Sequence, residues 1–132
     1  MWSDLGEYIT NLCDNKSKNP SKIVEIGIGK FFLVSNYLKT CKNIDLLMTD
    51  ATPANNEIIK DDITKPDLDL YENTEIIYSI RPPPELQPYL ANLTDKTRAI
   101  LIIRPLSNED LNINKKMTLV NYKKAMFYEH IP

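Results

Sequence analysis

The apolar residues of this chain follow two spacings, one typical of helices and the other typical of buried strands. Near the start of the chain, apolar residues recur at i, i+3, i+4 and i+7, namely at Leu5, Tyr8, Ile9 and Leu12. This spacing predicts one face of a helix, with Ser3 as its N-cap. The run Ile23–Ile28 is apolar except at Glu25, which predicts a strand that is buried on both faces of a sheet.

Further strands and helices alternate along the rest of the chain. The predicted strands are Leu46–Thr49, Ile58–Ile59, Glu75–Ile80 and Ala99–Ile103, with Met117–Val120 and Ala125–Tyr128 as a closing hairpin. The predicted helical segments are Phe31–Leu38, one turn at Leu68–Tyr71 and a helix that starts near Glu85 after three prolines. Since the segment 51–57 is too short for a helical crossover, we expect Ile58–Ile59 to be a reduced edge strand. The alternation predicts one α/β domain over residues 1–132, with three layers and a doubly wound, mostly parallel sheet.

Composition and charge narrow the class of protein. Of the 132 residues, 42% are hydrophobic and 26% are charged, which is typical of a soluble globular domain. The formal net charge of -2 provides no basic surface for nonspecific nucleic-acid binding. No apolar run reaches membrane-spanning length, and the N-terminus does not have the pattern of a signal peptide. Cys13, Cys41 and His130 do not have the spacing of a zinc site, so we expect no metal, and two reduced thiols favour a cytoplasmic location. The oligomeric state is left open.

Candidate ligand-binding residues follow the predicted strands, because doubly wound sheets bind ligands at the carboxyl ends of their strands. Gly27 and Gly29 end the first strand, where glycines let a ligand approach the backbone and the start of the next helix. Asp50 ends the second strand about 20 residues later, where nucleotide-binding folds place an acid on the ribose hydroxyls. The alternatives are a simple strand-to-helix corner for the glycines and a turn residue for Asp50.

Two more groups of polar residues follow the later strands. Asp61 and Asp62 are solvated loop residues or, for Asp62, a contact to a base or ribose. The tripeptide Ile-Arg-Pro ends two strands that should be neighbours, and it contributes Arg81 and Arg104. Two guanidinium groups at one edge would hold a carboxylate or a phosphate, or would simply pair with nearby acids.

Glu25 distinguishes between classes of nucleotide ligand. Dinucleotide fingerprints require a third glycine at a position where this chain has Phe31 or Phe32. An acid two residues before the first glycine is typical of S-adenosylmethionine-dependent methyltransferases. In its first five strands, the chain therefore resembles class I methyltransferases, which have a Rossmann-like fold. The resemblance implies S-adenosylmethionine as cofactor, with Glu25 near its methionine end, Asp50 on the ribose and Asp62 near the adenine.

A more specific resemblance rests on three strings at 24–29, 61–64 and 77–86, of which the Arg-Pro-Pro-Pro-Glu-Leu string at 81–86 is the most specific. These strings are similar to those of a small archaeal family of short, uncharacterised Rossmann-like proteins. That family implies a fold but no activity, so the resemblance identifies no catalytic residue.

The chain also departs from the methyltransferase pattern. Phe31 replaces a glycine at a position where the backbone follows the cofactor, and the helix that would wall the adenine after Asp50 has almost no residues. The segment from Ser79 keeps the prolines of amino-methylating enzymes but has no carboxylate or amide for a substrate amine. The candidates for a substrate or an anion are therefore Ser79, Arg81 and Arg104.

Three functions are consistent with these residues. The first is a protein that binds S-adenosylmethionine or a related nucleoside through Glu25, Gly27, Gly29, Asp50 and Asp62. The second is a non-catalytic scaffold or binding protein in which Phe31 fills the cofactor space. The third is an enzyme or sensor that holds an anionic small molecule through Arg81 and Arg104.

Overall fold

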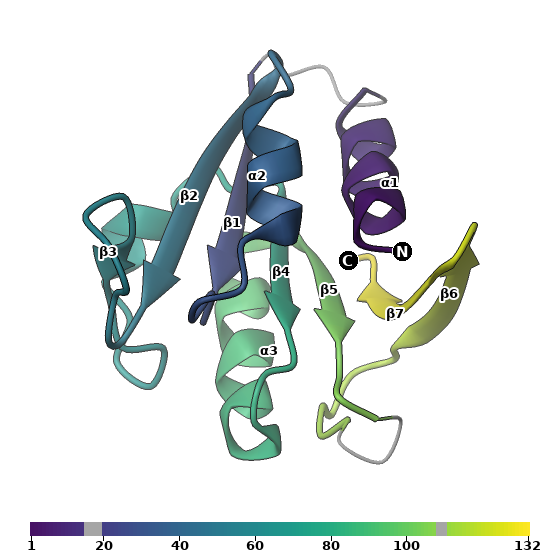
Figure 1. Ribbon diagram of the computed structural model, residues 1–132. Helices are drawn as coiled ribbons and strands as arrows, with labels where there is room; N and C mark the ends of the chain where they lie inside the picture. The colour runs from purple at the N-terminus through teal and green to yellow at the C-terminus, as the bar shows by residue number, and fades with distance from the viewer. Residues whose placement is uncertain (15–19, 108–110) are drawn as a thin grey trace.

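The computed structural model describes residues 1–14, 20–107 and 111–132, and within these residues the chain forms a seven-stranded sheet (Figure 1). The strand order is β3-β2-β1-β4-β5-β7-β6. The strands are β1 (Ser21–Ile26), β2 (Ile44–Asp50), β3 (Ile59–Lys60), β4 (Ile76–Ile80), β5 (Ile100–Arg104), β6 (Thr118–Tyr122) and β7 (Ala125–His130). The helices are α1 (Trp2–Asp14), α2 (Leu33–Lys39) and α3 (Gln87–Thr97), with 3-10 turns η1 (Leu68–Tyr71) and η2 (Pro84–Leu86).

The sheet is parallel from β3 to β5 and is completed by the antiparallel hairpin. β1 lies at the centre and pairs in parallel with β2 on one side and with β4 on the other. β7 pairs antiparallel with β5 and with β6, so the hairpin joins the same sheet. The fold class predicted from the sequence is therefore confirmed, and the carboxyl ends of β1, β2 and β4 meet at one edge.

Helices cover both faces of the sheet and give the three predicted layers. Figure 1 shows α1 and α2 on the near face and α3 on the far face. Successive residues of β1 supply the two cores, because side chains alternate between the faces of a strand. Ile23 packs with Leu5 of α1 and Leu38 of α2, whereas Val24 packs with Leu90 of α3.

Several element boundaries differ from the sequence prediction. α1 begins at Trp2, ahead of Ser3, so Ser3 lies inside the helix and does not cap it. β1 ends at Ile26 because Gly27 has a left-handed backbone with φ of +70°, and α2 begins only at Leu33. β6 runs on to Tyr122, so the loop between the two hairpin strands is shorter than predicted. At its other end, β7 runs on to His130.

The reduced edge strand is confirmed, but it lies one residue later than predicted, at Ile59–Lys60 and not at Ile58–Ile59. β3 has only two residues, and its register with β2 pairs Thr49 with Ile59. The connection from β2 to β3 contains turns but no helix, which agrees with the short crossover that the sequence predicts. In the described parts of the chain, no helix is both long enough and apolar enough to cross a membrane.

Candidate functional site

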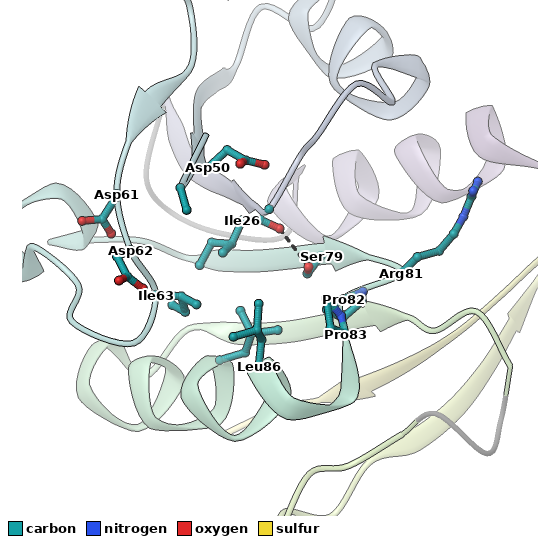
Figure 2. A pocket seen from close by; sticks show the side chains of 13 residues that line it. Ile26, Asp50, Asp61, Asp62, Ile63, Ser79, Arg81, Pro82, Pro83 and Leu86 are labelled. Atoms are coloured by element: carbon teal, nitrogen blue, oxygen red, sulfur yellow. Dashed lines mark hydrogen bonds between the residues drawn. The ribbon is translucent and has the colours of Figure 1, made fainter. Parts of the chain in front are cut away.

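A pocket of about 360 Å³ opens at the carboxyl ends of β1, β2 and β4, on the α3 side of the sheet (Figure 2). Its polar lining comes from β2, from the loop after β3 and from the end of β4. Its apolar lining comes from the end of β1, from the loop after β3, and from the segment that leads from β4 into α3. The lining residues are Ile26, Gly27, Asp50, Ala51, Asp61, Asp62, Ile63, Ser79, Arg81, Pro82, Pro83, Leu86 and Leu90. The volume is within the range of small-molecule sites, about 300–1,000 Å³.

Gly27 and Gly29 form the turn that leaves β1. Both have a left-handed backbone, with φ of +70° and +59°. An added Cβ at Gly27 would lie 4.0 Å from the Ser79 hydroxyl oxygen, and one at Gly29 would meet no atom within 4 Å. The turn therefore requires glycine for its backbone conformation, and it leaves the space above Gly27 open to the pocket.

Ser79 holds the floor of the pocket together. Its hydroxyl donates to the backbone carbonyl of Ile26 at 2.8 Å, which joins the end of β4 to the end of β1. The Ser79 side chain is buried, and it lines the pocket. Its role as a substrate contact stays a prediction.

Asp50 connects the end of β2 to the glycine turn. Its Oδ2 accepts a hydrogen bond from the Gly29 backbone N–H at 2.8 Å, and its Oδ1 accepts one from the Thr52 N–H at 2.9 Å. The Thr52 hydroxyl also lies 3.3 Å from Oδ1. Since an ionised carboxylate has about four acceptor positions, Asp50 can still accept a hydrogen bond from a ligand at the pocket.

Asp61 and Asp62 bring the loop after β3 to the same pocket. Asp62 Oδ1 accepts from the Thr64 N–H at 2.9 Å and from its hydroxyl at 2.8 Å, and these bonds hold the pKa of the Asp62 carboxyl below its usual value. Asp61 accepts from the buried Tyr71 hydroxyl at 2.5 Å. The sequence predicted Asp62 as a site residue, and Asp61 joins it on the pocket wall.

Glu25 does not line the pocket. It is 1% exposed and lies on the α1–α2 side of the sheet, where its Oε1 accepts a hydrogen bond from the Tyr78 hydroxyl at 2.6 Å. Burial raises the pKa of the Glu25 carboxyl to about 8, against the opposing effect of the Tyr78 hydrogen bond. A direct contact between Glu25 and a ligand stays a prediction.

Arg81 lines the pocket, but its guanidinium group lies elsewhere. The side chain points away from the carboxylates and toward α1, as Figure 2 shows. The guanidinium carbon lies 4.9 Å from the centre of the Phe31 ring and 5.4 Å from the centre of the Trp2 ring. The Phe31 ring therefore packs against Trp2 and Arg81, and it does not line the pocket.

Arg104 stands apart from Arg81 in its contacts. Its Nη1 donates to the carbonyl of Pro105 at 2.6 Å, and it is absent from the pocket lining. The backbone carbonyl of Arg104 accepts from the Arg81 N–H at 2.6 Å, so the two residues are neighbours through the backbone. That both guanidinium groups hold one anion stays a prediction.

The sequence did not predict the apolar wall of the pocket. Ile63, Leu86 and Leu90 line it, and the last two come from the turn and helix after the prolines. Leu86 and Leu90 are four residues apart and so lie on one apolar face of this helical segment, a spacing that by itself predicts core packing and no ligand contact. The available signal was their position, because the start of a helix after β4 must lie at the same edge as Gly27 and Asp50.

The fold of the chain is similar to that of solved S-adenosylmethionine-dependent methyltransferases. A solved structure of the plantazolicin methyltransferase BpumL, in complex with SAH, matches 77% of this chain and 45% of its own, with a TM-score of 0.57 and 15% identity. The structure of MtNAS in complex with MTA and tNA matches 96% of this chain and 58% of its own, with a TM-score of 0.61 and 14% identity. The chain spans about half the length of these structures.

The chain belongs to the uncharacterised protein family UPF0146, whose profile matches residues 3–132. A UPF0146 protein of Methanothermobacter thermautotrophicus is 42% identical over 131 residues, which cover 99% of this chain and 96% of the relative. A UPF0146 protein of Methanocaldococcus jannaschii is 44% identical over 130 residues, which cover 92% of this chain and 90% of the relative. The archaeal family that the sequence resembles is therefore confirmed.

Proposed function

We propose that the protein binds S-adenosylmethionine or a related adenine nucleoside in the pocket above Gly27. The observation that carries the proposal is the composition of this pocket, which has aspartates on one side and aliphatic side chains on the other. An adenine nucleoside needs both, since its base favours an apolar wall and its ribose hydroxyls favour carboxylate acceptors.

The distribution of residues suggests an orientation for the ligand. Ile63 and Leu86 would contact the faces of the adenine, and Asp62 would accept hydrogen bonds near the base. Asp50 would accept from the ribose hydroxyls, because it lies at the end of β2 beside the glycine turn. The remainder of the ligand would then pass over Gly27, where the turn leaves open space.

The charge of the pocket supports a neutral or cationic ligand. Three of its lining residues are aspartates, and the Arg81 guanidinium lies over Phe31 and Trp2 on the far side. A pyrophosphate would meet carboxylates without a compensating cation, which disfavours a dinucleotide. The sulfonium of S-adenosylmethionine is attracted by the same carboxylates.

The position of Phe31 opposes the scaffold alternative. A protein that had lost the cofactor site through Phe31 would have this ring above Gly27, whereas the ring packs edge-on against Trp2 at 4.7 Å between centres. The proposal concerns ligand binding, and methyl transfer would need a second substrate at the same edge. Such a transfer depends mainly on positioning of the two reactants.

Isothermal titration calorimetry with S-adenosylmethionine, S-adenosylhomocysteine and 5′-methylthioadenosine tests the proposal. We expect binding to the unmodified protein and a loss of about tenfold or more in affinity for Asp50→Asn and for Asp62→Asn, because each removes a charged acceptor. At Asp62, asparagine keeps the turn contacts, because only Oδ1 accepts from Thr64 there. At Asp50, both oxygens accept from backbone N–H groups, so asparagine also loses one of these two bonds.

Asp45→Asn is the matched control, since Asp45 is an exposed residue at the opposite end of β2. Absence of heat for all three nucleosides at millimolar concentration would reject the proposal. Equal losses of affinity in the control and in the two pocket variants would also reject the assigned site.

A further inference from the structure

A second hollow lies at the amino edge of the sheet, at the opposite ends of the parallel strands from the pocket above Gly27. Its volume is about 410 Å³, and it opens where β4 and β5 begin and where the chain leaves β7 (Figure 1). We call it the amino-edge hollow, and its lining residues are Thr74, Glu75, Arg98, Ile100, Ile131 and Pro132. None of these residues lines the pocket above Gly27, so the hollow is independent of the proposed nucleoside site.

Glu75 brings a carboxylate without a partner to the amino-edge hollow. Its Oε2 atom is buried and accepts no hydrogen bond from the described residues, and none of their cations lies within ion-pair distance of it. Buried polar atoms in folded proteins are nearly always hydrogen-bonded, so an unpaired acceptor at a hollow indicates a place for a donor. The two oxygens of a carboxylate exchange when the end of the side chain rotates, so a donor in the hollow can bond to either.

Arg98 brings a cation to the same hollow. It ends α3 with a left-handed backbone, φ of 58°, and its N–H donates to the Thr94 carbonyl at 2.7 Å, which fixes the position of its backbone. The side chain is exposed, and over residues 1–14, 20–107 and 111–132 no carboxylate lies within ion-pair distance of its guanidinium. Glu75 and Arg98 therefore line one hollow with opposite charges and do not pair with each other.

Two isoleucines give the amino-edge hollow an apolar part. Ile100 begins β5 and is 5% exposed, whereas Ile131 follows β7 and is 61% exposed. The register of β5 with β7 pairs Leu101 with His130, so Ile100 and Ile131 come next on the two neighbouring chain segments. An aliphatic group in the hollow would remove part of the exposed Ile131 side chain from water, which is favourable.

We infer that the amino-edge hollow binds a free α-amino acid with an aliphatic side chain. Its ammonium group bonds to the Glu75 carboxylate, its carboxylate bonds to the Arg98 guanidinium, and its side chain contacts Ile100 and Ile131. A simple anion would leave Glu75 unpaired and would be repelled by it, and a simple amine would have the same disadvantage at Arg98. A peptide carries its two terminal charges far apart, so it would satisfy only one of the two residues.

Isothermal titration calorimetry with L-leucine tests the inference. L-leucinamide keeps the ammonium group without the carboxylate, and 4-methylpentanoate keeps the carboxylate without the ammonium group. We expect leucine to bind the unmodified protein about tenfold or more tightly than either probe, because each probe lacks one charged hydrogen bond. Glu75→Gln and Arg98→Met should each weaken leucine binding about tenfold or more. Glu75→Gln should not weaken 4-methylpentanoate, and Arg98→Met should not weaken leucinamide.

Glu72→Gln and Lys42→Met are the matched controls. Both residues are exposed, Glu72 lies three positions before Glu75, and Lys42 precedes β2 at the same edge of the sheet. Neither residue lines the hollow, so both variants should bind leucine as the unmodified protein does. Chemical denaturation of each variant shows whether it is folded in the titration.

Several outcomes would overturn the inference. The first is absence of heat with leucine at millimolar concentration. The second is equal affinity of the unmodified protein for leucine and for one of the probes, which would show that one charge is not recognised. The third is unchanged leucine binding in folded Glu75→Gln or in folded Arg98→Met. The fourth is a loss in either control equal to that in the hollow variants, since it would show a general charge effect.

Discussion

The two faces of the sheet differ sharply at the edge where β1 and β4 end. On the α3 face, Gly27 and Asp62 are exposed, and the space between β1 and the loop after β3 is open. On the α1–α2 face, Glu25 and Tyr78 are 1% and 0% exposed, and the Tyr78 hydroxyl donates a hydrogen bond to the Glu25 carboxyl. One face therefore carries a ligand-sized pocket, and the other carries a closed, packed polar pair.

This difference follows from the alternation of side chains along a strand. Glu25 and Ile26 are adjacent in sequence, but they point to opposite faces, so only Ile26 reaches the pocket. A motif that is contiguous in sequence is thus divided between two environments. We expect substitutions on the closed face to change stability first, and those on the open face to change ligand binding first.

The largest expected effect comes from Tyr78→Ala on the closed face. This change removes a fully buried ring from the core and leaves Glu25 without its hydrogen-bond donor. We expect a loss of about 3–5 kcal/mol in the free energy of unfolding, measured by chemical denaturation. Tyr78→Phe should cost about 1–3 kcal/mol, because it keeps the ring and removes only the hydroxyl. Equal losses in the two variants would show that the ring contributes little to this core.

Glu25→Gln should change how stability depends on pH. Because the pKa of Glu25 in the folded protein is raised to about 8, folding keeps this carboxyl protonated while the unfolded chain ionises it. Its contribution is fully present below the ordinary glutamate pKa and is lost as pH rises toward 8. Between pH 5 and 9, the unmodified protein should lose on the order of 4 kcal/mol in the free energy of unfolding relative to Glu25→Gln.

Denaturation of both proteins across this range measures the difference directly. Tyr78, which faces Glu25, does not titrate in this range, since burial keeps its pKa well above the ordinary value. Parallel stability curves for the two proteins would mean that Glu25 is ionised in the folded state. The closed face would then be more polar than its burial indicates.

Much of the fold could be predicted because its signals are local. The apolar run of β1 and the spacing of Leu5 and Ile9 identified a central strand and its covering helix. The short connection after Asp50 correctly predicted a two-residue β3, since loop length limits the possible crossovers. The start of α1 could not be predicted from Ser3, because packing of Trp2 on Phe31 extends the helix past that cap.

The candidate site could be predicted only in part. Gly27, Asp50 and Asp62 were found from their positions after strands, and all three line the pocket. Glu25 is separated from these three residues because its side chain lies on the other face of β1. Which face of β1 carries the pocket depends on how the helices pack on the sheet. The contact of Arg81 with Phe31 and Trp2 joins residues that are far apart in sequence, so no spacing rule could indicate it.

The smallest change in stability should come from substitutions at the two turn glycines, Gly27 and Gly29. These variants also show how far along the turn the ligand extends. Gly27→Ala and Gly29→Ala each place a side chain at a left-handed position, which should cost about 1–2 kcal/mol of stability. An added Cβ has no close contact at either site, so the two losses should be similar. Only Gly27 lines the pocket, so only Gly27→Ala should also lower the affinity for S-adenosylhomocysteine in a titration. Equal affinity losses would move the ligand along the turn toward Gly29, and no loss in either variant would place the ligand away from the backbone of β1.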